Sequence, residues 1–424
     1  MATLVIGWLS NQFDLSPKVT NLRIGFVIPR YGSEIIGGAE NATRLLAEAL
    51  VRHQGYKVDI LTTTAIEIEA WNNHFPSGDC ELNGVRVHRY KVEGRRLPNF
   101  YQATKRALNA PKSMSLAESL EVIRLQGPVS PKLNDAISTY NGDLIAFYTY
   151  LYHPIVTGVT LTNLPKIFHP TAHNEPMLDL PIFKEVFNSI DALVYHTPSE
   201  RQIVEDRFAV AQKPAMILGM GYENTSQNRD DRSLLPSSII NSKYLLCLGR
   251  VDTQKGATLL ADLFKEYKTR NPSDLKLVFA GPISILPNPH PDIEVLGSVD
   301  EPTKHTLLAN MELLISPSPF ESFSIVLIEA WAHQKAVMVN RSCGPTTNQA
   351  RASGGGLSFD SYENFEATLS LLLTNTPLRN QLANNGTQYV AKKYQWPNLT
   401  ARYNEFLTSV RKGKSALDSS LPNN

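Results

Sequence analysis

Signatures of several common enzyme classes are missing from this chain of 424 residues. It contains no Asp-x-Asp pair, so a metal-bridged diphosphate is not indicated. No Gly-x-x-x-x-Gly-Lys-Ser/Thr loop supports an NTPase, and no Gly-x-Ser-x-Gly turn supports an α/β-type hydrolase. The chemistry must therefore be sought among other charged side chains and glycine turns.

The net charge and the number of cysteines are also small. The formal net charge is only +1, which gives no global electrostatic signal for nucleic acid. Three widely spaced cysteines, Cys80, Cys247 and Cys343, argue against a disulfide framework and favour reduced thiols. The first twenty residues lack a basic start followed by a long apolar core, so we expect no signal peptide and a cytoplasmic location.

One uncharged stretch, residues 144–165, is long enough to span a membrane. It contains several Tyr and Thr residues, with Pro154 near its middle. A buried strand followed by a buried helix explains this composition better than a membrane span.

Strands and helices alternate from about residue 22, which favours parallel, doubly wound sheets. The polar run Asn224–Ser233 interrupts this alternation, and a second series begins near residue 243. We predict an N-terminal domain at 1–225, a linker at 226–242 and a C-terminal domain at 243–395. A helix at 396–412 and a disordered tail at 413–424 complete the prediction.

Glu321 and Glu329 bracket a segment that follows the apolar strand Leu313–Ser316 and continues into an apolar helix. An isolated pair of acids is usually solvated. Here Glu329 lies among apolar residues, where a carboxylate is seldom buried without a partner. We expect Glu321 to accept hydrogen bonds from sugar hydroxyls and Glu329 from a ribose. Backbone N–H groups near Ser322, Phe323 and Ser324 would hold a phosphate or sugar oxygen at the helix start.

Three motifs in order resemble those of the retaining glycosyltransferases of family four. They are the Glu–seven residues–Glu segment, the Gly249–Gly256 loop and the glycine-rich turn Ile36–Glu40. The similarity covers most of residues 22–412. It implies the α/β GT-B fold, in which two Rossmann-like domains face a cleft, and a last helix that crosses back to the N-terminal domain. The donor would lie mainly on the C-terminal domain and the acceptor on the N-terminal one.

Cationic groups for a departing diphosphate are predicted on one loop. Arg250 and Lys255 follow an apolar strand, and such cations stabilise charge most as it forms. The alternative is that Arg250 and Lys255 are ordinary solvated surface side chains. Gly37 and Gly38 would let the backbone approach the diphosphate at a helix start.

The resemblance also implies a histidine beside the transferred sugar. His173 occupies the matching position just after a strand, with His169 as a weaker candidate. A packed histidine with a backbone partner is the competing interpretation. Asn174 and Glu175 would line the same wall.

Two further segments match the family's nucleobase site. Gly281 ends an apolar strand, and Val299 would contribute backbone hydrogen bonds, with Pro282 or Ile283 packed against the base.

The stretch 94–112 is basic and carries aromatic residues. Whether it binds an acceptor, touches an anionic membrane or is only a solvated loop stays open. A peripheral membrane contact would involve the N-terminal domain.

These observations predict a retaining glycosyltransferase that moves a hexosyl unit from a nucleoside diphosphate sugar to a hydroxyl acceptor. Its donor would be a UDP-sugar rather than a GDP-sugar, and no metal or tightly bound cofactor is expected. By family frequency, the pathway would be surface polysaccharide or glycolipid synthesis. Alternatives are a synthase acting on a sugar phosphate, a nucleotide-sugar epimerase of the same fold and a non-catalytic nucleotide-sugar-binding scaffold.

Overall fold

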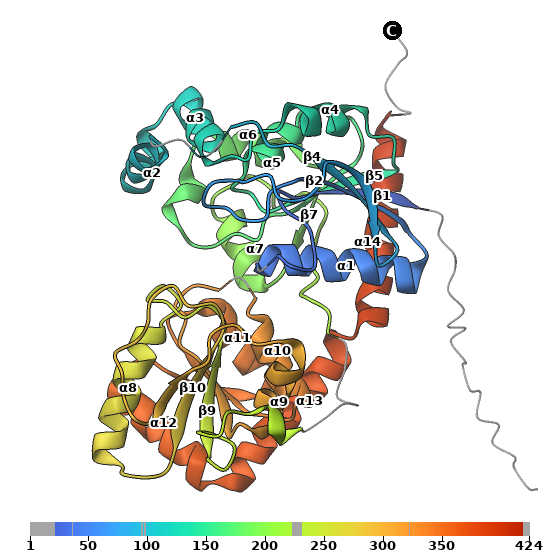
Figure 1. Cartoon of the computed structure of the whole chain (residues 1–424). Coiled ribbons are helices and arrows are strands. Elements are labelled where there is room, and N and C mark those ends of the chain that lie inside the picture. The colour runs from blue at the N-terminus through green and yellow to red at the C-terminus, as the bar shows by residue number, and fades with distance from the viewer. Residues whose placement is uncertain are drawn as a thin grey trace, which may run out of the picture.

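The protein is described from a computed structural model that covers residues 22–35, 37–94, 96, 99–222, 231–321 and 323–418. The chain forms two α/β units, one above the other in Figure 1, each built around its own sheet. The predicted linker at 226–242 lies partly outside the described residues, and the predicted domain limits stay predictions.

The N-terminal unit contains an eight-stranded sheet in the order β3-β4-β2-β1-β5-β6-β7-β8. All neighbouring strands are parallel except β3 and β4, which form an antiparallel edge. The strands are β1 (Arg23–Val27), β2 (Lys57–Thr63), β3 (Gly78–Leu82), β4 (Val85–Tyr90), β5 (Leu144–Tyr148), β6 (Lys166–His169), β7 (Ala192–Tyr195) and β8 (Ala215–Ile217).

Helices cover both faces of this sheet, as a parallel sheet with buried strands requires. They are α1 (Gly38–Gln54), α2 (Phe100–Asn109), α3 (Leu116–Gln126), α4 (Pro131–Thr139), α5 (His153–Gly158), α6 (Ile182–Ser189) and α7 (Pro198–Glu205), with 3₁₀ turns η1 (Pro111–Ser113) and η2 (Pro176–Asp179). The stretch 144–165 supplies β5 and α5, as predicted. In the part of the chain that the structure describes, no helix combines the length and apolar character needed to cross a membrane.

The C-terminal unit holds a fully parallel sheet of six strands in the order β11-β10-β9-β12-β13-β14. These strands are β9 (Tyr244–Leu248), β10 (Lys276–Ala280), β11 (Ile293–Val295), β12 (Leu313–Ser316), β13 (Val337–Asn340) and β14 (Gly356–Phe359). The surrounding helices are η3 (Arg232–Leu234), α8 (Ala257–Arg270), α9 (Glu301–Asn310), α10 (Ile325–Ala332), α11 (Gly344–Ser353), α12 (Tyr362–Thr374) and α13 (Thr376–Lys393). Two parallel-sheet units confirm the predicted fold class.

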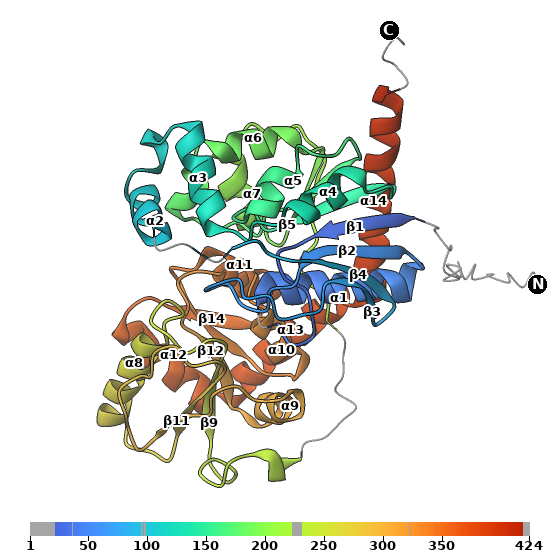
Figure 2. The same cartoon turned by 45° about the horizontal axis from the view of Figure 1, so that its top comes forward.

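The last helix, α14 (Trp396–Asp418), leaves the C-terminal unit and runs along the N-terminal one, as Figure 2 shows. The Tyr403 hydroxyl lies 2.8 Å from Nε2 of His169, and the Tyr56 hydroxyl donates to Asn404 at 2.7 Å. The helix continues past 412, so the prediction of disorder from residue 413 is wrong for 413–418. Residues 419–424 lie outside the described part of the chain.

Candidate active site

The carboxyl ends of β9 and β12 bring two predicted site residues together. These strands are neighbours in the C-terminal sheet, so the loops that follow them leave from the same edge. Lys255 follows β9 and Glu321 follows β12, and the Nζ–Oε1 distance is 2.8 Å. Both side chains keep partial exposure, 33% and 19%, so the pair stays reachable by a ligand.

Asp252 organises the cationic loop, and the sequence analysis did not single it out. This buried carboxylate accepts the Lys255 backbone N–H at 2.6 Å and the Arg250 Nε–H at 2.7 Å. Its position in the sequence between Arg250 and Lys255 could have indicated that it pairs with them. The Arg250 guanidinium, about half exposed, therefore pairs with Asp252 rather than with Glu321.

Glu329 lies on α10 with a lysine already beside it. The Lys304 ammonium, from α9, lies 2.9 Å from its carboxylate and 2.8 Å from that of Glu301. Burial lowers the pKa of Lys304, but the two carboxylates outweigh this effect and raise it. A ribose bound by Glu329 would share that carboxylate with Lys304, a partner that the sequence did not indicate.

The segment between the acids turns sharply into α10. Ser324 has a left-handed backbone with φ of 66°, and its buried hydroxyl has no hydrogen-bond partner among the described residues. Phe323, at this turn, is buried and packs against the rings of His196 and Tyr394. Ser322 lies outside the described residues.

His173 reaches the same region from the N-terminal unit, on the loop after β6. Burial is the largest influence on its imidazole and lowers its pKa; Lys255 acts in the same direction, against Glu175 and Glu321. The ring is therefore neutral near pH 7, and its buried Nδ1 has no partner among the described residues. A neutral imidazole can orient a sugar hydroxyl.

His169 is part of the core and does not reach the cleft. Its ring is fully buried, stacks on Tyr148 at 4.1 Å and bonds to Tyr403. The weaker histidine candidate is therefore wrong.

Residues of both units line a cavity of about 540 Å³ between them. His173, Ser199 and Gln202 come from the N-terminal side, while Phe320, Glu321 and Asn348 come from the C-terminal side. The Asn348 amide donates to the Ser199 hydroxyl across the gap at 2.8 Å. The cavity thus combines the predicted histidine with the predicted glutamate.

The glycine turn before α1 lies next to an acidic side chain, that of Glu40. Gly38 begins the helix, and a Cβ added at Gly37 would lie 2.1 Å from Oε2 of Glu40. Glu40 is also bonded to the buried Arg30 guanidinium. Neither glycine is among the described residues that line the interdomain cavity. A phosphate at this helix start would therefore lie close to the negatively charged Glu40 carboxylate. Ile36, the first residue of the predicted turn, lies outside the described residues.

The predicted nucleobase segment begins with a close backbone crossing. Gly281 has φ of 145°, and a Cβ there would lie 2.0 Å from the carbonyl oxygen of Gly249. Its N–H donates to the Gly297 carbonyl at 2.8 Å. Beyond this crossing Ile283 is 45% exposed, whereas Val299 packs against the core.

The buried carboxylate of Glu200 fixes the loop that carries His173. It accepts the N–H of Ala172 at 2.9 Å and the N–H of His196 at 2.6 Å, which joins the ends of β6 and β7. Thr171, between β6 and His173, is held in a left-handed conformation with φ of 51°. Burial raises the pKa of Glu200 to about 7, although these N–H donors lower it. No pattern in the sequence indicated this role.

This chain is similar to proteins that transfer glycosyl groups. Residues 237–389 match the family model of "Glycosyl transferases group 1". These residues are therefore similar to a group 1 glycosyltransferase domain. The matched residues include Arg250, Lys255, Glu321 and Glu329, and the match supports glycosyl transfer as the kind of reaction.

Relatives and solved structures extend the match beyond this domain. An uncharacterized glycosyltransferase of Methanocaldococcus jannaschii is 22% identical over 89% of this chain and 96% of its own length. The lipopolysaccharide 1,2-N-acetylglucosaminetransferase of Salmonella typhimurium is 25% identical over 47% of this chain and 58% of its own length.

Sucrose-phosphate synthase of Thermosynechococcus elongatus superposes with a TM-score of 0.66 at 14% identity, over 93% of this chain and 100% of that one. Anabaena HepE in complex with UDP and glucose gives 0.63 at 14% identity, over 92% of this chain and 100% of that one. The fold is GT-B.

Proposed function

We propose that the protein transfers a hexosyl unit from a nucleoside diphosphate sugar to a hydroxyl acceptor with retention of configuration. The observation that carries the proposal is the Lys255–Glu321 pair beside a cavity that also contains His173. A UDP-sugar is the favoured donor, because a structural neighbour is described in complex with UDP and glucose. The E. coli trehalose-6-phosphate neighbour is described with UDP-2-fluoro glucose.

Each residue has a role that follows from its charge and position. Lys255 stabilises the negative charge that forms on the departing diphosphate, an interaction that is strongest in the transition state. Glu321, bonded to Lys255, accepts hydrogen bonds from the sugar hydroxyls, and neutral His173 orients the sugar from the opposite wall. Arg250, held by Asp252, adds positive charge at the mouth of the loop. These cations supply the charge stabilisation that a bridging metal gives in other transferases.

Front-face departure and attack would explain retention without a covalent intermediate. The leaving diphosphate oxygens take the acceptor proton, while the protein aligns the two substrates. Under this proposal Glu321 holds the sugar ring and does not become glycosylated.

Surface polysaccharide or glycolipid synthesis is the pathway class we favour, because one relative acts on lipopolysaccharide. We place the reaction in the cytoplasm because all three cysteines are free thiols. A synthase acting on a sugar phosphate is the second candidate, since sucrose-phosphate synthase has the same fold.

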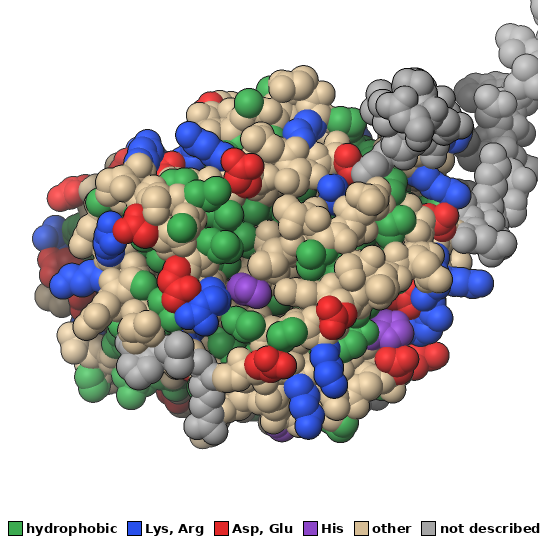
Figure 3. Space-filling model, turned by 90° about the horizontal axis from the view of Figure 1, so that it is seen from above, with side chains coloured by type: hydrophobic (Ala, Val, Ile, Leu, Met, Phe, Trp, Pro, Cys, Tyr) green, Lys and Arg blue, Asp and Glu red, His purple; other side chains and the backbone are tan. Residues whose placement is uncertain are grey.

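Contact with a membrane would be electrostatically weak on one face of the N-terminal unit. Figure 3 shows that face with basic and acidic side chains interspersed rather than gathered in a single basic field. Attraction to anionic lipid grows with the number of clustered basic residues, so this face offers little of it.

Calorimetry with UDP, GDP and ADP, followed by a donor-hydrolysis screen, tests the proposal. We expect UDP to bind best, and NMR of the product to report the anomeric configuration of the donor. Binding of none of the three nucleotides by the wild-type chain would favour a scaffold instead.

Substitution of the central pair tests the assigned roles. We expect Lys255→Ala to lower turnover about 100- to 1,000-fold, as loss of one preorganised charge-stabilising group does. Glu321→Gln should lower turnover while leaving UDP affinity within about threefold of wild type. Lys265→Ala, which removes an ion-paired lysine of α8, is the matched control and should leave turnover unchanged. Full turnover by Glu321→Gln would contradict the role given to that carboxylate.

A further inference from the structure

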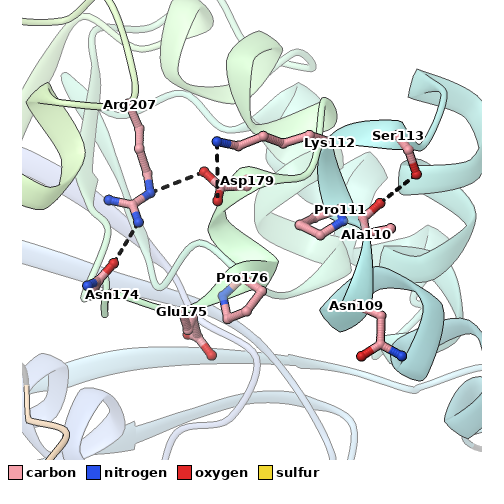
Figure 4. Close-up of a pocket in the computed structure, with 10 residues that line it drawn as sticks. All are labelled: Asn109, Ala110, Pro111, Lys112, Ser113, Asn174, Glu175, Pro176, Asp179 and Arg207. Carbon is pink, nitrogen blue, oxygen red and sulfur yellow. Dashed lines mark hydrogen bonds and ion pairs between the residues drawn. The ribbon is translucent and has the colours of Figure 1, made fainter.

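A second cavity, of about 580 Å³, lies within the N-terminal unit (Figure 4). Its polar lining comes from three separate regions: the α2–η1 corner, the segment from the β6 loop to η2, and the stretch just after α7. These polar residues are Asn109, Lys112, Ser113, Asn174, Glu175, Asp179 and Arg207. Pro111 and Pro176 line the same space and offer apolar rings.

This second cavity adjoins the interdomain one. Asn174 lines both cavities, His173 lines the interdomain one, and Glu175 lines the second. The two cavities are therefore neighbours along the chain, joined by three consecutive residues, His173 to Glu175. A ligand held here would reach the donor sugar past the Asn174 side chain.

Arg207 fixes the geometry of this cavity. Its Nη2 lies 2.6 Å from Oδ1 of Asn174, and its Nε lies 3.2 Å from Oδ1 of Asp179. A third bond runs to the Ile203 carbonyl at 3.1 Å. Figure 4 shows the guanidinium between the amide and the carboxylate. These three bonds hold the guanidinium in place between the Asn174 amide and the Asp179 carboxylate.

The charges of the lining are balanced. Asp179 lies 3.2 Å from Arg207 and 4.0 Å from the exposed ammonium of Lys112. Glu175 adds a second carboxylate, which accepts a hydrogen bond from the Tyr150 hydroxyl at 2.5 Å. A phosphate entering this space would meet two carboxylates as well as two cations, and both cations already pair with Asp179. Sugar hydroxyls can instead donate to the carboxylate oxygens without adding charge.

We propose that this cavity is the acceptor subsite and that it receives an uncharged glycosyl unit rather than a sugar phosphate. The inference rests on the proposed transferase function and specifies its acceptor. Asn174, Glu175 and Asp179 accept or share hydrogen bonds with the hydroxyls, while Pro111 and Pro176 pack on the C–H faces of the ring. The Asn109–Lys112 corner of the basic stretch 94–112 then belongs to the acceptor site.

Saturation-transfer NMR on the full chain with bound UDP tests this inference. The probes are methyl glycosides of glucose, galactose, mannose and N-acetylglucosamine, and the 6-phosphates of glucose and fructose. We expect at least one methyl glycoside to bind and to be displaced by none of the hexose phosphates at equal concentration. Arg207→Ala should weaken that binding at least tenfold, because Asn174 and Asp179 lose their shared partner.

Asp179→Asn provides the charge test. It removes one negative charge beside Arg207 and Lys112, so the hexose phosphates should gain affinity relative to the methyl glycosides. Arg201→Ala is the matched control, because Arg201 lies on the nearby helix α7, does not line the second cavity and pairs with Glu205 at 2.8 Å. This control should bind the probes as wild type does, and UDP affinity should be equal in all variants.

Three outcomes would overturn the inference while UDP binding stays intact: a preference of the wild type for hexose phosphates, unchanged glycoside binding by Arg207→Ala, or no binding of any probe. Loss of UDP binding by the wild type would instead contradict the proposed function itself. The two failures are therefore distinguishable.

Discussion

Single buried carboxylates do as much for this site as the residues that would touch substrate. Asp252 holds the cationic loop, and Glu200 holds the loop that carries His173. Only Asp252 had a signal in the sequence, its position between two predicted cations. An acid in a loop or at a helix start is usually solvated. Only the folded backbone shows which N–H groups converge on it. By contrast, the strand-and-loop pattern around Lys255 and Glu321 predicted two residues that the structure places in contact.

Glu200→Gln tests the positioning role of that carboxylate. The variant leaves one backbone N–H without a good acceptor, which costs about 1–3 kcal/mol at a buried site. We expect UDP affinity to stay unchanged and donor hydrolysis to fall, since only the His173 loop shifts. Glu205→Gln, at the end of the same helix, is the control, because that partly exposed carboxylate pairs with Arg201. Wild-type hydrolysis by Glu200→Gln would contradict this role.

The pH dependence of stability offers an independent readout for Glu200. Its pKa is raised from 4.5 to about 7 in the folded state, so the folded protein favours the protonated acid. This contribution to stability is complete below pH 4.5 and is lost as the pH rises through about 7. The shift corresponds to about 3 kcal/mol. Denaturant unfolding should show the stability gap between wild type and Glu200→Gln narrowing from pH 5 to pH 8.

At the scale of elements, buried parallel strands were the most predictable features. The strand predicted at Leu313–Ser316 agrees with β12, and the uncharged stretch 144–165 contains the predicted strand and helix, β5 and α5. The edge strands β3 and β14 were missed, because Gly78–Leu82 is polar and exposed and Gly356–Phe359 begins with glycine. The pairing of Glu329 with Lys304 depends on how α9 and α10 pack, which no local pattern encodes.

Gly281→Ala tests the backbone crossing at the ends of β9 and β10. The new methyl group would meet the Gly249 carbonyl at 2.0 Å, at a φ of 145° that other residues rarely adopt. We expect a loss of more than about 3 kcal/mol in denaturant unfolding. Gly78→Ala, at a φ of 116° with open space around it, isolates the cost of the backbone angle alone. Equal losses in the two variants would show that the clash is relieved elsewhere.

For the whole molecule, the two halves share one structural element. Leu407 and Tyr403 of α14 are fully buried in the core cluster that contains Ile24, Phe26 and Leu46 of the N-terminal unit. The resemblance predicted such a helix, but the length of α14 did not follow, because its polar last turns resemble a disordered tail. The N-terminal core is thus complete only when this helix is in place.

Leu407→Ala measures that dependence. Removing a fully buried leucine side chain should cost about 2–5 kcal/mol, and the N-terminal unit should lose stability first. Leu371→Ala, on the exposed face of α12, removes the same atoms from a site that is 43% exposed and should change stability by less than about 1 kcal/mol. Hydrogen exchange followed strand by strand would locate the loss. Protection lost only in the C-terminal sheet would contradict the expectation.

Helix α14 also constrains the order of events during synthesis. Every strand of the N-terminal sheet is made before the chain reaches Trp396, yet the apolar surface that α14 will cover has no partner until then. During translation this half must therefore wait, partly assembled and open to misassociation, for the final segment to emerge. A nascent chain halted before residue 396 should accordingly bind chaperones that recognise exposed apolar surface, and release from them should follow once α14 has docked.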